Sequence, residues 1–460
     1  MSEIHQSGPP VRLNRTLGLW NLIIIGMVII QPTAPMGIYG VISNTAHGQV
    51  VTTILVAMVA MLFTAISYGR MARVYPSAGS AYTYVGRQMH HALGYLVGWG
   101  MVMDYLLNPL ICTAFCAKAA MNIVPGLSFY VWISFFAAFF TVLNLRGIRT
   151  SAQLNEALCA GMVVVVALFL ACAARTVCGA EHPPGFYWHP FLETGTFHPE
   201  SLFAGTSVAV LTYIGFDAVS TLSEEVQNPR RNILLATVLV CLITGVLSGL
   251  EVYAAQLVWG SKPFPGADVE SAFALVARQA GGAVLFQVVN FTLLVANMGS
   301  GMGSQLAAGR LLYGMGRGNA LPKGFFGAID PKRRVPRNNI LLVGAFALAG
   351  AALLELFANR LGGGAYEIGA EALNFGAFVA FMGVNAAAFL YCWRKGGRSI
   401  LGLALPALGF LICAFIWIHL SRPALVLGAV WMLAGIAYGA VRTKGFRAEL
   451  VTFEVPAEEG

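Results

Sequence analysis

Three carboxylic acids lie inside long apolar stretches of the sequence: Asp104, Asp217 and Glu251. A charged side chain is costly in a stretch long enough to cross a membrane, and it is treated there as functional by default. Such an acid can bind a cationic group or carry a proton. Asp217 directly follows a glycine-containing interruption, and Asp104 is followed by Tyr105 and a polar helix face.

Two of the apolar stretches are interrupted in their middle. The first contains Pro32 and Pro35, which remove backbone donors, and the second contains Gly215. At a break in mid-membrane, the carboxyl end of a half-helix attracts an ammonium group and the amino end attracts a carboxylate. The breaks and two neighbouring polar positions therefore predict a binding site for an amine or amino acid, formed by Gln31, Pro32, Thr33, Ala34, Pro35, Met36, Gly37, Asp104, Tyr105, Tyr213, Ile214, Gly215, Phe216 and Asp217.

Several of these residues have a structural interpretation as well. Asp217 is also suited to an ordinary helix N-cap, and Asp104 to a buried structural hydrogen bond. The small polar residues Ser300 and Ser304 are explained by helix packing as well as by ion ligation. The candidates for coupling to an ion are Asp217, Glu251, Ser300 and Ser304.

Motifs for covalent chemistry are absent from the sequence. No HExxH, GxxxxGK[ST] or GxSxG occurs, so the chemistry of zinc proteases, P-loop ATPases and serine hydrolases is missing. Cys112 and Cys116 lie four residues apart and supply too few ligands for a metal site. We therefore expect no enzyme, cofactor or bound metal, but a carrier or a channel.

The elements that position these residues follow from the composition. Of the 460 residues, 57% are apolar and 10% are charged, against about 25% charged in soluble domains. A soluble globular protein, a disordered chain and a disulfide scaffold are thereby excluded. The sequence predicts an all-α integral membrane protein whose twelve apolar segments each span the bilayer as a helix, at 17–43, 50–69, 92–117, 127–145, 154–176, 201–222, 232–259, 283–307, 339–358, 368–393, 400–419 and 423–441.

Basic residues fix the expected orientation. With alternating loops and a cytoplasmic N-terminus, 22 Lys and Arg residues lie inside and 6 outside, as the positive-inside rule requires. Both termini are expected in the cytoplasm, and the basic residues then indicate topology and not binding to nucleic acid. Glu224, Glu225 and Arg310 fall near inner ends of spans, where we expect their side chains to reach the lipid headgroups.

Three motifs carry a resemblance to a known family. The segment from Gly69 to Tyr84 resembles the loop between spans two and three of the amino acid–polyamine–organocation (APC) transporters. Tyr213-Ile-Gly-Phe-Asp217, followed by Glu224-Glu225 and Asn228-Pro229-Arg230, resembles their broken sixth span, and the segment from Arg310 to Pro322 is similar to their loop after span eight. The likeness is greatest to the putrescine-importer branch.

This resemblance implies the leucine-transporter (LeuT-like) fold, a 5+5 inverted repeat with two further helices among 12 transmembrane helices. The expected division is a cytoplasmic segment 1–16, a core 17–393 with repeats at about 17–176 and 201–393, helices eleven and twelve in 394–441, and a cytoplasmic tail 442–460. The resemblance also implies that Asp217 matches the acid that family members use in proton-coupled amine recognition.

Two departures from the family pattern bear on substrate and ion. Gly37 stands where putrescine importers carry an aspartate in span one, so one amine anchor is missing. The span-five lysine that replaces a sodium ion in some proton-coupled members is also missing, because the region near Met162 is apolar.

The combined prediction is a secondary active transporter that imports a small amine across the cytoplasmic membrane, driven by protons or, alternatively, sodium. A substrate resembling putrescine is favoured, and the hypothesis is that Asp217 holds a proton and the substrate ammonium in turn. One alternative is a neutral or cationic amino acid permease, which Gly37 favours. An alternative of another class is an amine channel or a membrane sensor that does not pump.

Overall fold

Helices form nearly all regular structure in the chain. The computed structural model describes residues 15–442 except 125, 147, 193–198, 266–268, 270, 362–363 and 396–398. Within these residues the β structure is limited to one parallel bridge between Leu17 and Val226. The expected segments 1–16 and 442–460 therefore lie almost entirely outside the described residues.

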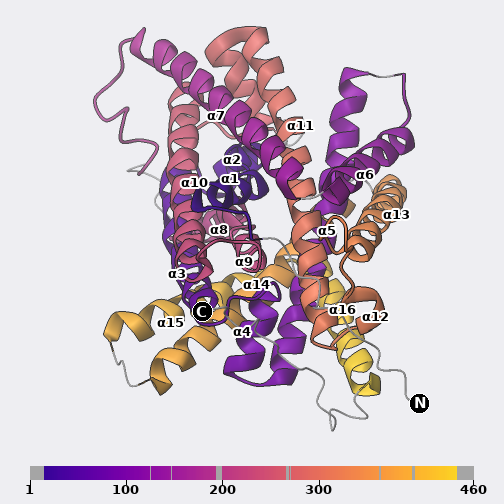
Figure 1. Ribbon diagram of the computed structural model, residues 1–460. Coiled ribbons are helices and arrows are strands. Elements are labelled where there is room, and N and C mark those ends of the chain that lie inside the picture. The colour runs from indigo at the N-terminus through magenta and orange to yellow at the C-terminus, as the bar shows by residue number, and fades with distance from the viewer. Residues whose placement is uncertain are drawn as a thin grey trace, which may run out of the picture.

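The helices run in chain order through the bundle shown in Figure 1. The first part of the chain forms α1 Leu19–Ile30, α2 Ala34–Thr45, α3 Val50–Val74, α4 Ser80–Gln88, α5 His91–Ile123, α6 Phe129–Arg146 and α7 Ile148–Cys178. The second part forms α8 Pro199–Ala209, the 3-10 helix η1 Val210–Tyr213, α9 Ala218–Thr221, α10 Pro229–Trp259, α11 Ala272–Arg317, α12 Lys323–Phe326, α13 Arg337–Leu361, α14 Gly364–Arg394, α15 Ile400–Ile418 and α16 Arg422–Arg442.

The twelve predicted spans are confirmed. In the described part of the chain, 11 helical segments are long and apolar enough to cross a membrane, and the bent pair α1–α2 makes up to 12. Two details were not predicted. The loop after α3 contains the buried helix α4, and α11 is kinked at Gly281 and Gly282, where Gly282 has a φ of 72°.

The segments predicted to face the cytoplasm meet at one end of the bundle, which carries α4 and α12 and lies at the bottom of Figure 1. We call it the α4 end. Side chains there bridge different inter-helix segments, in the pairs Arg70 with Gly402, Arg394 with Gln88, Arg442 with Asn319 and Arg333 with Leu145. The other end joins Asn44 to Phe264 and Thr52 to Phe191. The segments thus alternate between the two ends as expected.

The last helix is attached to the bundle by a pair of tryptophans. Trp99 Nε1 donates to the Trp431 carbonyl at 2.9 Å, and Trp431 Nε1 donates to the Trp99 carbonyl at 2.9 Å. Their rings stack with centroids 5.2 Å apart. Tyr95 adds a hydrogen bond of 2.8 Å to the carbonyl of Gly435. These contacts join α16 to α5 and satisfy both indole donors away from water.

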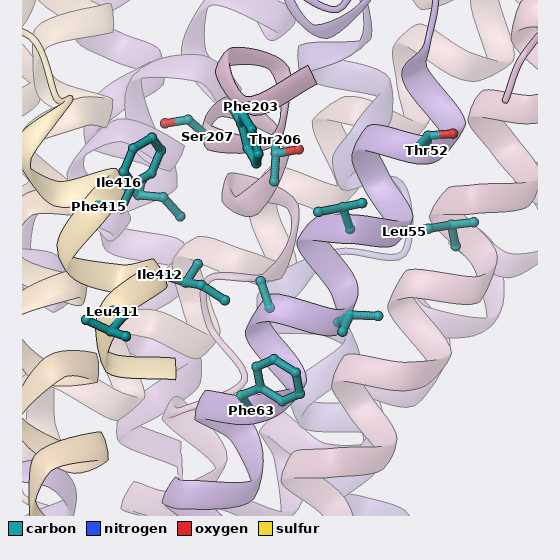
Figure 2. A pocket seen from close by; sticks show the side chains of 13 residues that line it. Thr52, Leu55, Phe63, Phe203, Thr206, Ser207, Leu411, Ile412, Phe415 and Ile416 are labelled. Atoms are coloured by element: carbon teal, nitrogen blue, oxygen red, sulfur yellow. The ribbon is translucent and has the colours of Figure 1, made fainter. Parts of the chain in front are cut away.

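A lateral groove of about 770 Å³ opens between α3, α8 and α15, as Figure 2 shows. Its lining is mostly apolar, with Phe63, Phe203 and Phe415 among the side chains. The hydroxyls of Thr52 and Thr206 in its wall donate to backbone carbonyls. The residues that line it include none of the predicted site residues, so the groove is part of the apolar exterior and not the predicted binding site.

Candidate binding site at two broken helices

The first span breaks at the predicted prolines. The helical ladder of α1 ends with the bond from Gln31 N to Met27 O, and Gln31 has a φ of 73°. Pro32 has no N–H to donate to the carbonyl four residues back, and the chain resumes as α2 with an axis bent by 43°. Pro35 stands in the first turn of α2, where its missing donor is harmless. The carboxyl end of α1 is thus exposed inside the bundle.

The sixth span breaks at Gly215. The helix α8 tightens into η1, and Ile214 is extended with a ψ of 128° before α9 begins. Gly215 has a φ of 121°, a conformation that is essentially restricted to glycine. Tyr213, just before the break, donates to the Ile54 carbonyl at 2.9 Å and holds η1 against α3.

The two breaks lie against each other. A Cβ atom added to Gly215 would lie 3.0 Å from Ile29 Cγ2 and 3.5 Å from Ile30 N, at the end of α1. One turn further along, Gly26 packs against Val219 of α9. Figure 1 shows α1, α2, α8 and α9 together in the middle of the bundle. The predicted juxtaposition of residues 31–37 and 213–217 is therefore present.

We predict that Gly215→Ala destabilises the protein by about 1–3 kcal/mol, because alanine is strained at this φ and its Cβ meets Ile29. The thermal midpoint of the purified protein measures the effect. Gly37→Ala is the matched control, since an added Cβ there meets no atom within 4 Å. Equal midpoints for the two variants would contradict the prediction.

Asp217 is fully buried beside the sixth-span break. Tyr105 Oη donates to Asp217 Oδ2 at 2.6 Å, which joins two residues that the sequence placed in the same site. Asp217 occupies the N-cap position of α9, but its side chain makes no capping bond. The interpretation as an ordinary cap is therefore wrong. Its Oδ1 has no hydrogen-bond partner among the described residues, so one carboxyl oxygen remains free for another group.

Aromatic rings enclose the chain next to this acid. Phe216 stacks on Phe381 with ring centroids 5.2 Å apart, and Tyr68 meets both rings edge-on at 5.7 and 5.8 Å. All three rings are buried. The sequence analysis included Phe216 but missed Tyr68 and Phe381, because isolated aromatics in apolar helices carry no signal of their own.

Asp104 is buried on α5, one residue before Tyr105, and is 2% exposed. Its Oδ2 has no hydrogen-bond partner within the described ranges, and its carboxyl group interacts electrostatically with that of Asp217. The backbone of α5 approaches α14 closely here, since a Cβ on Gly376 would lie 2.9 Å from Asp104 N. Asp104 and Asp217 therefore form one acidic pair.

Glu251 lies apart from that pair, on α10. It is 0% exposed. Neither of its carboxyl oxygens has a hydrogen-bond partner among the residues that the structure describes. The structure therefore contains a third intramembrane carboxyl group, outside the contacts made by Asp217.

Span eight reaches the first break through its small polar residues. Ser300 Oγ donates to the Ile29 carbonyl at 2.7 Å, close to the end of α1. Ser304 is buried one turn further on, next to Gly303, which packs on Ile29. From span five, Met162 contacts the Thr33 hydroxyl at 3.9 Å. A methionine thus stands against the first break where some relatives carry a cation, as the sequence indicated.

The predicted residues of the first break differ in exposure. Pro32, Thr33, Pro35 and Met36 are buried, whereas Gln31 and Ala34 are partly exposed and Gly37 is exposed. Open space surrounds the position that a side chain on Gly37 would occupy.

The α4 end is closed by ion pairs that the sequence analysis missed. Arg310 and Glu225 are 1% and 3% exposed and form a buried salt bridge, and Arg317 pairs with Glu224 at 2.6 Å. The expectation that Glu224, Glu225 and Arg310 reach the headgroups is therefore wrong. Two acids in one loop and two arginines in another were the available signal, because buried charges need opposite partners.

The N-terminal segment is bound to the same loop. The N–H groups of Thr16 and Leu17 donate to the carbonyl of Glu225, and Gln227 N donates to Leu17 O at 2.9 Å. Ala78 N donates to Glu224 at 3.0 Å, which adds the loop before α4. Four segments distant in sequence thus close this end of the bundle.

Glu225→Gln is expected to lower the stability of this closed conformation by about 3–5 kcal/mol, because Arg310 would remain buried without its counter-charge. Thermal unfolding of the purified protein tests this. In the control Glu355→Gln, the affected partner Lys118 is 43% exposed, so the cost should be about 1 kcal/mol or less. A smaller loss for Glu225→Gln than for Glu355→Gln would refute the buried-pair argument.

These features define a class of protein. Twelve apolar spans, two of them broken side by side, with buried carboxyl groups at the breaks, are the architecture of a secondary transporter whose site lies near the middle of the membrane.

The chain belongs to the amino acid permease family, whose model matches residues 22–452. It is 32% identical to the low-affinity putrescine importer PlaP of Escherichia coli (strain K12), over 96% of this chain and 97% of that protein. It is 26% identical to the branched-chain amino acid permease BcaP of Lactococcus lactis, over 94% and 96% of the two chains. The vacuolar cationic amino acid transporter 4 of Arabidopsis thaliana is 28% identical over 75% of this chain and 60% of its own.

Family membership confirms several predictions. The chain is a multi-pass membrane transport protein of the APC superfamily with the LeuT-like fold, and it is not an enzyme. The resemblance to putrescine importers is likewise confirmed at the level of relatives. The residue limits of the repeats, 17–176 and 201–393, stay a prediction.

Proposed function

We propose that this transporter imports a small amine, with putrescine favoured, together with protons across the cytoplasmic membrane. The observation that carries the proposal is Asp217, a buried acid beside both helix breaks with one oxygen bonded to Tyr105 and the other free. A free carboxylate oxygen in a site of low dielectric is a strong acceptor for an ammonium group. The relationship to PlaP, described as a putrescine importer, supports the same substrate class.

The backbone supplies the second attraction for an amine. The carbonyls at the carboxyl end of α1 carry the negative end of the helix dipole, and they face the Gly215 break. An ammonium group held by Asp217 would lie near these carbonyls. Asp104 adds negative charge to the same region, which suits a substrate with more positive than negative charge.

The proposed orientation places the α4 end in the cytoplasm. Of the 28 Lys and Arg residues, 22 belong to the segments assigned to that side. Both termini then lie in the cytoplasm, and the ion pairs of Glu224 and Glu225 close the cytoplasmic end of the pathway. Transport requires these pairs to separate when substrate is released inward.

An amino acid is the second candidate substrate, and Gly37 is the observation that favours it. Its missing side chain leaves open space in the first turns of α2, where the amino end of the helix attracts a carboxylate. A zwitterion would then place its ammonium group near Asp217 and its carboxylate near α2. BcaP, described as a branched-chain amino acid permease, is a relative of this kind.

Uptake by purified protein in liposomes tests the proposal. Unlabelled putrescine, leucine, lysine and arginine compete with labelled putrescine, and the assay is repeated without sodium and with the proton gradient collapsed. We expect putrescine to compete best and uptake to require the proton gradient. Counterflow of label then separates a carrier from a channel or sensor, because only a carrier exchanges internal for external substrate.

A further inference from the structure

Import driven by protons needs a second carrier group, given the function proposed above. If Asp217 holds either a proton or the substrate ammonium, it exchanges one for the other and moves them in opposite directions. A proton that travels inward with the substrate must therefore be bound elsewhere. Asp104 interacts electrostatically with Asp217 and belongs to the same acidic pair, which leaves Glu251 as the separate carboxyl group in the membrane.

The position of Glu251 along α10 directs it toward the first span. Val240 packs against Gly26 of α1, and Thr244 donates to Met27 Sδ at 3.4 Å, so these two residues mark the face of α10 that meets α1. Glu251 follows Val240 by about three helical turns and Thr244 by about two. It therefore projects from the same face.

The depth of Glu251 matches the break in that span. Below it, Thr244 is level with Met27; above it, Gln256 accepts a hydrogen bond of 3.1 Å from Tyr39 in α2. The residues of the first span between Met27 and Tyr39 include the break at 31–33. Glu251 thus lies at the height where α1 ends and α2 begins.

No cationic side chain faces Glu251 from the helices packed on α10. The elements α1, α2, η1 and α9 contain no Asp, Glu, Lys, Arg or His. The charged residues of α3, α7, α11 and α10 itself lie toward the helix ends, and the uncharged titratable groups of the neighbouring elements are tyrosines and thiols: Arg70, Arg73, Arg149, Glu156, Arg175, Arg278, Arg310, Arg317, Arg230 and Arg231, with Tyr39, Tyr68, Tyr213, Tyr313, Cys159, Cys172 and Cys178. An ionised carboxylate without a partner is expensive to bury, so the closed conformation favours the neutral acid.

We propose that Glu251 binds the proton that drives uptake, separately from the substrate anchor Asp217. The proton forms an O–H bond with the carboxylate while the pathway faces outward. The neutral acid is then buried beside the first break, as the structure shows it. When α1 moves and water reaches this position from the cytoplasm, the O–H bond breaks, the proton leaves to water, and the carboxylate is regenerated.

Proteoliposomes with purified full-length protein separate the two roles. The assay measures labelled putrescine with the membrane potential clamped at zero and an inward proton gradient. The wild type should accumulate label by up to about tenfold per pH unit if one proton moves per substrate. Glu251→Gln, which mimics the permanently protonated acid, should keep counterflow within about twofold of wild type but accumulate no label above equilibrium.

Glu251→Asp and Glu355→Gln are the matched variants. The first keeps a titratable carboxyl and should retain accumulation, and the second removes a carboxylate outside the site and should leave both activities unchanged. Accumulation by Glu251→Gln at the wild-type level would overturn the proposal, as would loss of counterflow in that variant while Glu251→Asp keeps it. Absence of counterflow in the wild type would instead contradict the proposed amine transport, and accumulation driven only by sodium would exclude Glu251 as the proton carrier while leaving transport intact.

Discussion

Asp217→Asn is expected to reduce the apparent affinity for putrescine by about 10- to 100-fold, because an amide cannot provide the charge that pairs with an ammonium group. The variant keeps the size of the side chain and can still accept the hydrogen bond from Tyr105. Whatever binding remains should no longer depend on pH, since no proton competes at this position. Initial rates of labelled putrescine uptake between pH 5.5 and 8 measure both effects.

Two variants make the result specific to the site. Tyr105→Phe removes the donor but keeps the acid, so it should weaken uptake while its pH dependence persists. Asp330→Asn is the carboxylate control, in a loop outside the membrane. The N–H groups of Arg333 and Lys332 hold the pKa of Asp330 below its usual range, so it does not titrate in the assay. Wild-type pH dependence in Asp217→Asn would refute the role of Asp217.

Gly37→Asp is expected to shift preference toward diamines, lowering the putrescine KM by about tenfold or more. The structure has room for the side chain, because no atom lies within 4 Å of the added Cβ. The new carboxylate offers a second anchor for a substrate with two ammonium groups and repels the carboxylate of an amino acid. Competition between putrescine and leucine for uptake measures the shift.

Gly37→Asn has the same shape without the charge and serves as the control. It should leave the ratio of putrescine to leucine uptake close to that of the wild type. An equal shift in both variants would show that shape and not charge acts at this position. No shift in either would place the second amine of the substrate away from α2.

The breaks were predictable because they depend on covalent structure. Pro32 lacks an N–H and Gly215 lacks a Cβ, and neither property is altered by the surrounding fold. The burial of Asp217 followed from its position in the middle of an apolar stretch. Its partner was harder to predict, because the bond to Tyr105 joins residues 112 positions apart, although both had been placed in the site.

Contacts between loops were not predictable from local patterns. Arg310 and Glu225 each lie near the end of an apolar stretch, where a charged residue ordinarily reaches the interface. Only the packing of four distant segments makes their site dry enough to require pairing. The helix α4 was missed for a related reason, since its short sequence is buried by tertiary contacts and not by an apolar period of its own.

The backbone stitching of residues 16 and 17 onto the loop at 225–227 has a consequence for the working cycle. Three main-chain bonds fasten the start of the first span to that loop, and each contributes about 0.5–1.5 kcal/mol. The polypeptide that enters the membrane is thereby latched, so an unloaded molecule rests with its inner door shut and meets new cargo from the far side. Shortening the chain to residue 18 would remove this latch and favour molecules that leak or return empty.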